Sequence, residues 1–129
     1  MKKIKVKIPK AEVEFSISLN PKLKTTKELI HNLPLSGFLE IWGEELFLET
    51  ELEIPEEKPT MEVKAGDVAY WSPGNAVCFF FGPTPLSEEN SKKPIPASEV
   101  TIIGKIDSFK AAREKFSKLK PLQELFLEK

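Results

Sequence analysis

The side chains that most often carry covalent catalysis are scarce in this chain. It holds one histidine, His31, and one cysteine, Cys78. Hydrolysis by a serine would need His31 to be oriented by a carboxylate such as Asp67 or Asp107, and no serine lies in a Gly-x-Ser-x-Gly turn. Cys78 has apolar neighbours on both sides, which indicates a buried thiol without an activating partner. The sequence therefore predicts no catalytic residue, no metal site and no cofactor.

A group of carboxylates near Trp42 is the second place where chemistry is possible. Glu40, Glu44, Glu45 and Glu49 lie on both sides of this tryptophan. Several carboxylates beside an indole could hold a hard cation, or a cationic ligand stacked on the ring. The alternative is an ordinary solvated face whose carboxylates pair with lysines. From this group we select Trp42 and Glu40 as the weaker of two candidate ligand-binding clusters.

The stronger candidate cluster lies in Gly66–Pro85, where two apolar strands flank a turn. The residues of Ser72–Asn75 satisfy a type II turn, because proline presets φ at the second position and glycine accepts a positive φ at the third. This turn fixes which residues of the two strands lie opposite each other. The predicted pairs are Trp71 with Ala76, Ala69 with Cys78, and Asp67 with Phe80.

The two faces of this hairpin differ in the size of their side chains. One face has large apolar side chains that are typical of a core, namely Val68, Tyr70, Val77, Phe79 and Phe81. The other face has small residues between two aromatic ones, which describes a shallow apolar trough. We call it the outer trough, and it consists of Ala69, Trp71, Ala76, Cys78 and Phe80. The candidate ligand-binding residues of the stronger cluster are Trp71, Asn75, Ala76, Cys78 and Phe80.

An exposed apolar surface of this kind needs a cover, because large apolar patches are uncommon on soluble monomers. The segment Gly82–Ser98 is longer than most connections and contains four prolines. It could fold over the outer trough as a structural cover, or the trough could be a groove for a ligand or peptide. Both interpretations stay open, and a shift of one residue in the strand pairing would exchange the two faces.

The remaining strands follow from alternating apolar and polar residues. Lys3–Ile8 and Glu12–Leu19 form a hairpin if Pro9 and Lys10 make the turn, which places Val6 opposite Val13. The second hairpin spans Phe38–Glu49 around a type II′ turn, with Gly43 at its first central position. Its predicted outer face consists of Phe38, Glu40, Trp42 and Phe47. Further short strands are predicted over Thr50–Ile54, Met61–Lys64 and Val100–Ile106, and the total of about eight suits a closed barrel.

Two short helices are predicted to cover the ends of this barrel. Thr25 and Glu28 fit a capping box for a helix over Thr26–Asn32, which Pro34 would end. Asp107 or Ser108 caps the second helix, whose apolar stripe is Phe109, Ala112, Phe116 and Leu119. Leu122–Leu127 fits the period of a strand and that of a helix equally well, so its conformation is left open.

Length and composition restrict the broad class of protein. A chain of 129 residues is predicted to form a single domain, residues 1–129. With 19 basic and 20 acidic residues, it has no overall attraction to nucleic acid or to an anionic membrane. One cysteine permits no internal disulfide, and no apolar run approaches the length of a membrane span, so we expect a cytoplasmic protein. Its high proportion of charged residues, 30%, is typical of proteins from hot environments, and a thermophilic source is expected.

Four motifs together resemble a small prokaryotic family with a cyclophilin-like β-barrel. They are WGEE at Trp42–Glu45, GDVAYW at Gly66–Trp71, PGNA at Pro73–Ala76 and FFGPTP at Phe80–Pro85. The similarity extends through Ala97–Lys105 and covers most of the chain from about Leu35 to Ile106. The resemblance implies a mostly β fold, a closed eight-stranded barrel with two short helices at its ends, in a family whose biochemical activity is unassigned.

Cyclophilins proper isomerise X-Pro bonds, usually with a guanidinium placed against the prolyl nitrogen beside an apolar pocket. Arg113 is the only arginine here, and it lies in the second predicted helix and not on a barrel strand. The cyclophilin active site therefore cannot be transferred to this chain. We interpret the chain as a binding protein for a small molecule or a proline-containing peptide. The alternatives are an atypical peptidyl-prolyl isomerase and a self-associating structural protein that buries Trp42 or Trp71 in a homodimer.

Overall fold

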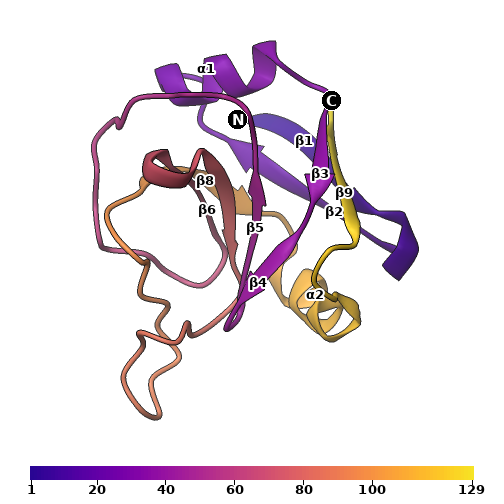
Figure 1. Ribbon diagram of the computed structural model, residues 1–129, viewed down its shortest axis with the longest axis vertical. Coiled ribbons are helices and arrows are strands. Elements are labelled where there is room, and N and C mark those ends of the chain that lie inside the picture. Colours follow the sequence, from indigo (N-terminus) through magenta and orange to yellow (C-terminus); the bar gives the residue numbers. More distant parts are fainter.

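The computed structural model describes all 129 residues, and its main feature is one antiparallel sheet of nine strands in the order β3-β9-β1-β2-β8-β6-β7-β5-β4. The two strands at the ends of this order, β3 and β4, are consecutive in the chain and joined through Leu39. The sheet therefore curls into a nearly closed barrel (Figure 1). The strands are β1 (Lys2–Ile8), β2 (Val13–Leu19), β3 (Leu35–Phe38), β4 (Glu40–Trp42), β5 (Glu45–Glu49), β6 (Asp67–Trp71), β7 (Ala76–Phe80), β8 (Thr101–Ile106) and β9 (Glu124–Glu128).

The predicted barrel is confirmed, with two differences in how the chain is divided into strands. The strand expected from Phe38 to the turn at Gly43 is shorter, as β4, which pairs with β5, and an additional strand that was not predicted, β3, precedes it and pairs with β9. The predicted strands Thr50–Ile54 and Met61–Lys64 are wrong, because both segments are irregular. Their apolar residues Ile54 and Val63 are nevertheless buried against the barrel. The alternating pattern therefore predicted which side chains are buried in these two segments. It did not predict their backbone conformation, because a strand also needs a neighbouring strand to pair with.

The undecided C-terminal segment forms β9, which lies between β1 and β3 in the sheet. Leu125 and Leu127 face the core and are completely buried. Leu122 precedes the strand with a positive φ of 70°, outside both regular periods. Pairing on both edges therefore favours the strand, and this information is not present in the local sequence.

The first hairpin has a longer turn than predicted. Pro9–Ala11 form a short 3₁₀ turn and Glu12 follows with a positive φ of 55°, so that Ile8 pairs with Val13. The predicted register, with Val6 opposite Val13, is wrong by two residues. Because side chains alternate with a period of two, this shift keeps every apolar residue on the core face.

Two short helices, α1 (Lys24–His31) and α2 (Phe109–Glu114), lie at different ends of the barrel (Figure 1). The predicted capping box of α1 is wrong, since neither Thr25 nor Glu28 caps it. The carboxylate of Glu57 instead accepts hydrogen bonds from the backbone N–H groups of Lys24 and Thr25, at 3.1 and 2.9 Å. A carboxylate from a distant loop thus satisfies the free donors of the first helical turn. No helix is both long and apolar enough to cross a membrane.

Helix α2 is shorter than its apolar stripe predicts, but the stripe itself is confirmed. The helix ends at Glu114 and the chain continues as a 3₁₀ turn over Phe116–Lys118. The rings of Phe109 and Phe116 pack against Phe81, with centroids 6.1 and 5.1 Å away. Helix α2 therefore closes one end of the barrel by aromatic packing on a residue that follows β7.

The main core fills the barrel and contains 24 buried residues. It includes all five large residues predicted for the inner face of the central hairpin, Val68, Tyr70, Val77, Phe79 and Phe81. Close strand packing at this core requires Gly104 on β8, where an added Cβ would lie 2.1 Å from the carbonyl oxygen of Ser18.

We predict that Gly104→Ala lowers the free energy of unfolding by about 1–3 kcal/mol, because the added methyl group meets backbone that cannot rotate away. Urea denaturation would measure this loss. Gly37→Ala is the matched control, since its nearest new neighbour is the mobile Cδ1 atom of Leu48. Equal stability of the two variants would contradict the expected backbone clash at Gly104.

Candidate functional site

The turn between β6 and β7 differs from the predicted type but preserves the predicted pairing. Ser72–Gly74 form a 3₁₀ turn, and the positive φ of 51° falls on Asn75 and not on Gly74. Trp71 pairs with Ala76 and Ala69 with Cys78, which confirms the register. The register survives because both turn types leave four residues between the paired strands.

Gly74 has a different role from the one predicted. A Cβ atom there would lie 2.5 Å from Cζ3 of Trp71. The indole therefore packs directly on the turn, and the absence of a side chain at Gly74 makes room for it. The carbonyl of Asn75 accepts hydrogen bonds from the N–H and hydroxyl of Thr50, at 2.9 and 2.8 Å. Asn75, a predicted ligand-binding residue, is thus a residue of the turn.

The outer trough forms as the pairing predicts. Ala69, Ala76, Cys78 and Phe80 belong to a second buried cluster on the outside of the barrel, separate from the main core. Trp71 packs against this cluster and is itself partly exposed. The outward orientation of Ala69 and Cys78 is therefore confirmed, and small side chains here leave space that a larger residue would fill.

The long segment Gly82–Ser98 covers part of the outer trough. Pro96 and Ala97 line one side of it, and the indole N–H of Trp71 donates a hydrogen bond to Oγ of Ser98 at 2.7 Å. Val63 and Val100 join the buried cluster from other segments. The chain therefore covers one region of the trough and leaves a cavity of about 290 Å³ beside it.

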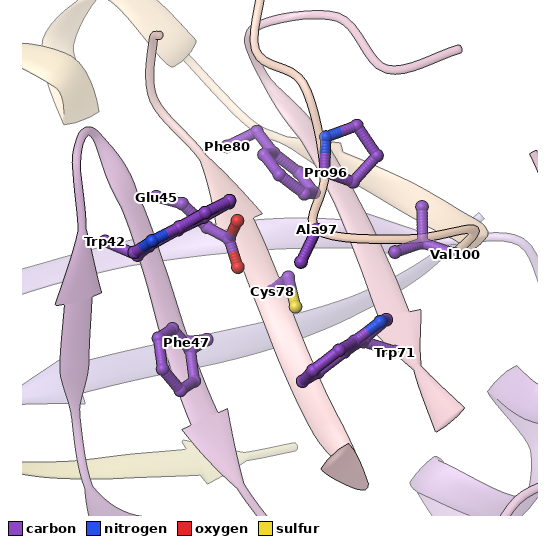
Figure 2. A pocket seen from close by; sticks show the side chains of 9 residues that line it. All are labelled: Trp42, Glu45, Phe47, Trp71, Cys78, Phe80, Pro96, Ala97 and Val100. Carbon is purple, nitrogen blue, oxygen red and sulfur yellow. The ribbon is translucent and has the colours of Figure 1, made fainter. Parts of the chain in front are cut away.

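This cavity brings together the two candidate clusters (Figure 2). Strand β5 lies between β4 and β7, so Trp42 and Trp71 border the same space although they belong to different hairpins. Seven of the nine lining residues are hydrophobic. The lining residues are Trp42, Glu45, Phe47, Trp71, Cys78, Phe80, Pro96, Ala97 and Val100.

The seven candidate residues from the sequence do not all reach the cavity. Four of them line it: Trp42, Trp71, Cys78 and Phe80. Ala76 is buried in the outer cluster, and Asn75 lies in the turn. Glu40 pairs with Phe47 on the β4–β5 ladder, outside the cavity lining.

The carboxylate that does line the cavity belongs to Glu45. Its side chain points into the space beside the indole of Trp42 (Figure 2). Glu45 is only 7% exposed and pairs with Trp42 on β4 and with Phe80 on β7. The alternation along β5 places it on the outer face, but the local sequence does not specify that β7 pairs with β5 and brings Phe80 beside Glu45. The cavity lining therefore includes Glu45 and not the predicted candidate Glu40.

The other carboxylates of this group do not assemble around Trp42. Glu44 forms an ion pair with Arg113 at 2.8 Å, and Glu49 is exposed at the far end of β5. No group of three or more His, Cys, Asp or Glu residues is placed to hold a metal ion. A multi-carboxylate site for a hard cation is thus not formed, and Glu45 is the one carboxylate of the cavity.

Burial dominates the electrostatics of this carboxylate. It raises the pKa of Glu45 from 4.5 to about 7, and a hydrogen bond from the Cys78 thiol only partly offsets this. Burial also raises the pKa of the Cys78 thiol well above its ordinary value, and the nearby Glu45 adds to the effect. Cys78 is therefore an unreactive thiol, whereas Glu45 changes its protonation state near neutral pH.

We predict that Glu45→Gln changes how stability depends on pH. A carboxyl whose pKa is raised on folding stabilises the folded state below about pH 4.5, and this contribution is lost as the pH rises through about 7. The total loss in the wild type is about 3 kcal/mol, and the amide avoids it. Denaturant unfolding at pH 5 and pH 8 should show the variant gaining relative to the wild type at the higher pH. Glu40→Gln is the control, and parallel profiles for Glu45→Gln and the wild type would refute the burial of a titrating carboxyl.

Comparisons with known proteins agree on the fold. No curated protein matches the chain. The solution structure of the hypothetical protein AF2241 from Archaeoglobus fulgidus is 27% identical, covers 98% of this chain and 92% of its own, and has a TM-score of 0.78. The structure of McbB in complex with tryptophan is 14% identical and has a TM-score of 0.63 over 98% of this chain and 44% of its own, which shows a shared fold. The family model described as cyclophilin-like matches residues 2–127, and the chain belongs to this cyclophilin-like family.

Proposed function

We propose that this protein binds a small, largely apolar molecule in the cavity between Trp42 and Trp71. The cavity, at about 290 Å³, has the size of a small ligand site, and its lining follows the usual pattern of apolar walls with few polar groups. Two indoles offer flat surfaces on which an aromatic or aliphatic molecule can pack. The observation that carries the proposal is the buried carboxylate of Glu45, which faces this cavity without a cationic partner.

A buried carboxylate without a cationic partner works against folding at neutral pH. A hydrophobic residue of similar volume at position 45 would extend the apolar outer cluster and avoid that cost. Groups of this kind are concentrated at functional sites, where stability is exchanged for chemistry. The position of Glu45 beside Trp42 in this cavity is therefore better explained by a ligand than by a structural role.

The size of the cavity favours a small molecule over an extended peptide. Pro96 and Ala97 border one side of it, and Trp71 is held to Ser98 by its indole N–H. A proline-containing peptide could place one side chain in this space, but most of its length would lie outside. McbB, which shares the fold, was solved in complex with tryptophan, and a molecule of similar size is consistent with the proposal.

We predict that native mass spectrometry of freshly purified protein detects a retained small molecule, and that Trp71→Ala abolishes this retention. Removing the indole takes away one wall of the cavity while leaving the barrel core unchanged. Phe38→Ala is the matched control, because Phe38 is a 63% exposed aromatic residue outside the cavity. Unchanged retention in Trp71→Ala, with the fold verified by circular dichroism, would rule out this cavity as the site.

The alternative is a peptidyl-prolyl isomerase, and cyclophilins usually place a guanidinium near the prolyl nitrogen for this reaction. Arg113 donates hydrogen bonds to the carbonyl of Phe81 and the carboxylate of Glu44, and none of the nine lining residues is basic. We therefore predict that micromolar protein does not accelerate cis-to-trans conversion in a protease-coupled assay on an X-Pro peptide. A faster conversion that is lost in Trp71→Ala would favour the isomerase over the binding protein.

A further inference from the structure

The chemistry of the cavity restricts which small molecules it can accept. Glu45 contributes its one carboxylate, and no basic side chain lines it. Bringing a ligand carboxylate or phosphate into this space would place two negative charges together in an apolar environment. Anionic ligands are therefore strongly disfavoured, which leaves neutral and cationic molecules.

The protein itself supplies no counterion for Glu45. The four ion pairs of the structure involve other carboxylates, those of Asp107, Glu128, Glu62 and Glu44. Arg113 approaches the same hairpin from α2, but its guanidinium binds Glu44 and the carbonyl of Phe81. A ligand cation would thus meet a carboxylate that is buried, directed into the cavity and free of competing cations.

The walls of the cavity suit a cation as well as an apolar body. Trp42 and Trp71 both border the space that Glu45 faces (Figure 2), and an indole face attracts a positive charge more strongly than any other side-chain ring. The rest of the lining, with Phe80, Val100 and Ala97, offers only apolar contacts. The indole N–H of Trp71 is already engaged by Ser98, so it is not a free donor for an anion.

We propose that the cavity is a site for a protonated amine carried on an aromatic or similarly apolar body. The ammonium group donates hydrogen bonds to the carboxylate of Glu45 between the two indoles, and the body packs against the apolar wall. This inference rests on the proposed small-molecule function and defines its ligand class. No covalent step is involved.

Amine binding is coupled to the protonation of Glu45. Among the groups that face it, β7 supplies Cys78 and Phe80, β4 supplies Trp42, and the long segment supplies Pro96 and Ala97. The pKa of the Cys78 thiol is raised by burial, so Glu45 is the member of this set that ionises near pH 7. The amine binds the ionised carboxylate, and its apparent affinity falls when Glu45 takes up a proton.

Three compounds with the same ring test the inference: phenethylamine is a cation, phenethyl alcohol is neutral and hydrocinnamate is an anion. The chain has two tryptophans and both line the cavity, so selectively excited tryptophan fluorescence reports binding of these phenyl compounds. At pH 8 we expect phenethylamine to bind about tenfold more tightly than the alcohol, and hydrocinnamate to bind most weakly. The affinity for the amine should fall about tenfold in total as the pH drops from 8 through the Glu45 pKa of about 7, to the level that Glu45→Gln shows at pH 8, whereas affinity for the alcohol should not change.

Two variants distinguish the preference for a cationic ligand from binding of the ring to the cavity. Glu45→Gln should lower the affinity for phenethylamine about tenfold while retaining that for phenethyl alcohol, which also shows that the variant is folded. Glu40→Gln, on the same hairpin but outside the lining, should bind like the wild type.

Two outcomes would overturn the inference. One of them leaves the proposed function standing, and the other overturns it as well. If phenethyl alcohol binds as tightly as phenethylamine, or if Glu45→Gln keeps the preference for the amine, the cavity binds small molecules without selecting a cation. The proposed function then stands without this ligand class. If none of the three compounds changes the fluorescence at millimolar concentration, both the ligand class and the proposed function are overturned.

Discussion

The arrangement of the whole site depends on β7 being buried on both faces. All five of its residues are buried, because Val77 and Phe79 face the barrel core while Ala76, Cys78 and Phe80 face an outer cluster. Antiparallel strands usually keep one face in water, so a two-sided strand requires a second apolar layer over the barrel wall. Here the second layer is built from side chains of β5 and β6 and from loop residues such as Val63, Pro96 and Ala97. The cavity is the space that this layer does not fill.

The same outer layer determines the chemistry of Glu45. A glutamate on the outer face of a barrel strand would ordinarily be solvated, but the neighbouring β7 and the covering segment leave this one 7% exposed. Loss of water raises the pKa of its carboxyl to about 7, and the nearby Cys78 thiol compensates only in part. The position of Glu45 thus has two consequences: burial of its carboxylate is unfavourable for folding, and the same carboxylate is available to a ligand. A cationic ligand supplies the partner that the protein chain lacks.

Membership of the cyclophilin-like family describes the barrel and leaves the chemistry to individual side chains. The only arginine shows this distinction. Arg113 joins α2 to the β4–β5 turn through Glu44 and to the chain after β7 through the carbonyl of Phe81. It therefore fixes the helix that closes one barrel end, next to the packing of Phe109 and Phe116 on Phe81. The guanidinium of Arg113 therefore has a structural role. The only charged group that lines the cavity between the tryptophans is the carboxylate of Glu45.

Local sequence determined which face of each strand points inward, because the alternation of side chains is a property of consecutive residues. In the first hairpin the predicted register differs by two residues from the observed one, and the same side chains still face the core. Local sequence also located the outer trough, since a four-residue turn after Trp71 sets the pairing whichever residue takes the positive φ. Tertiary structure alone decided that β5 lies beside β7, that the C-terminal segment becomes a strand, and that Glu57 caps a distant helix. It likewise decided that Glu45 and not Glu40 is buried. The physical reason is that burial and pairing depend on neighbours far away in the chain, and no local pattern specifies which strands or loops those neighbours will be.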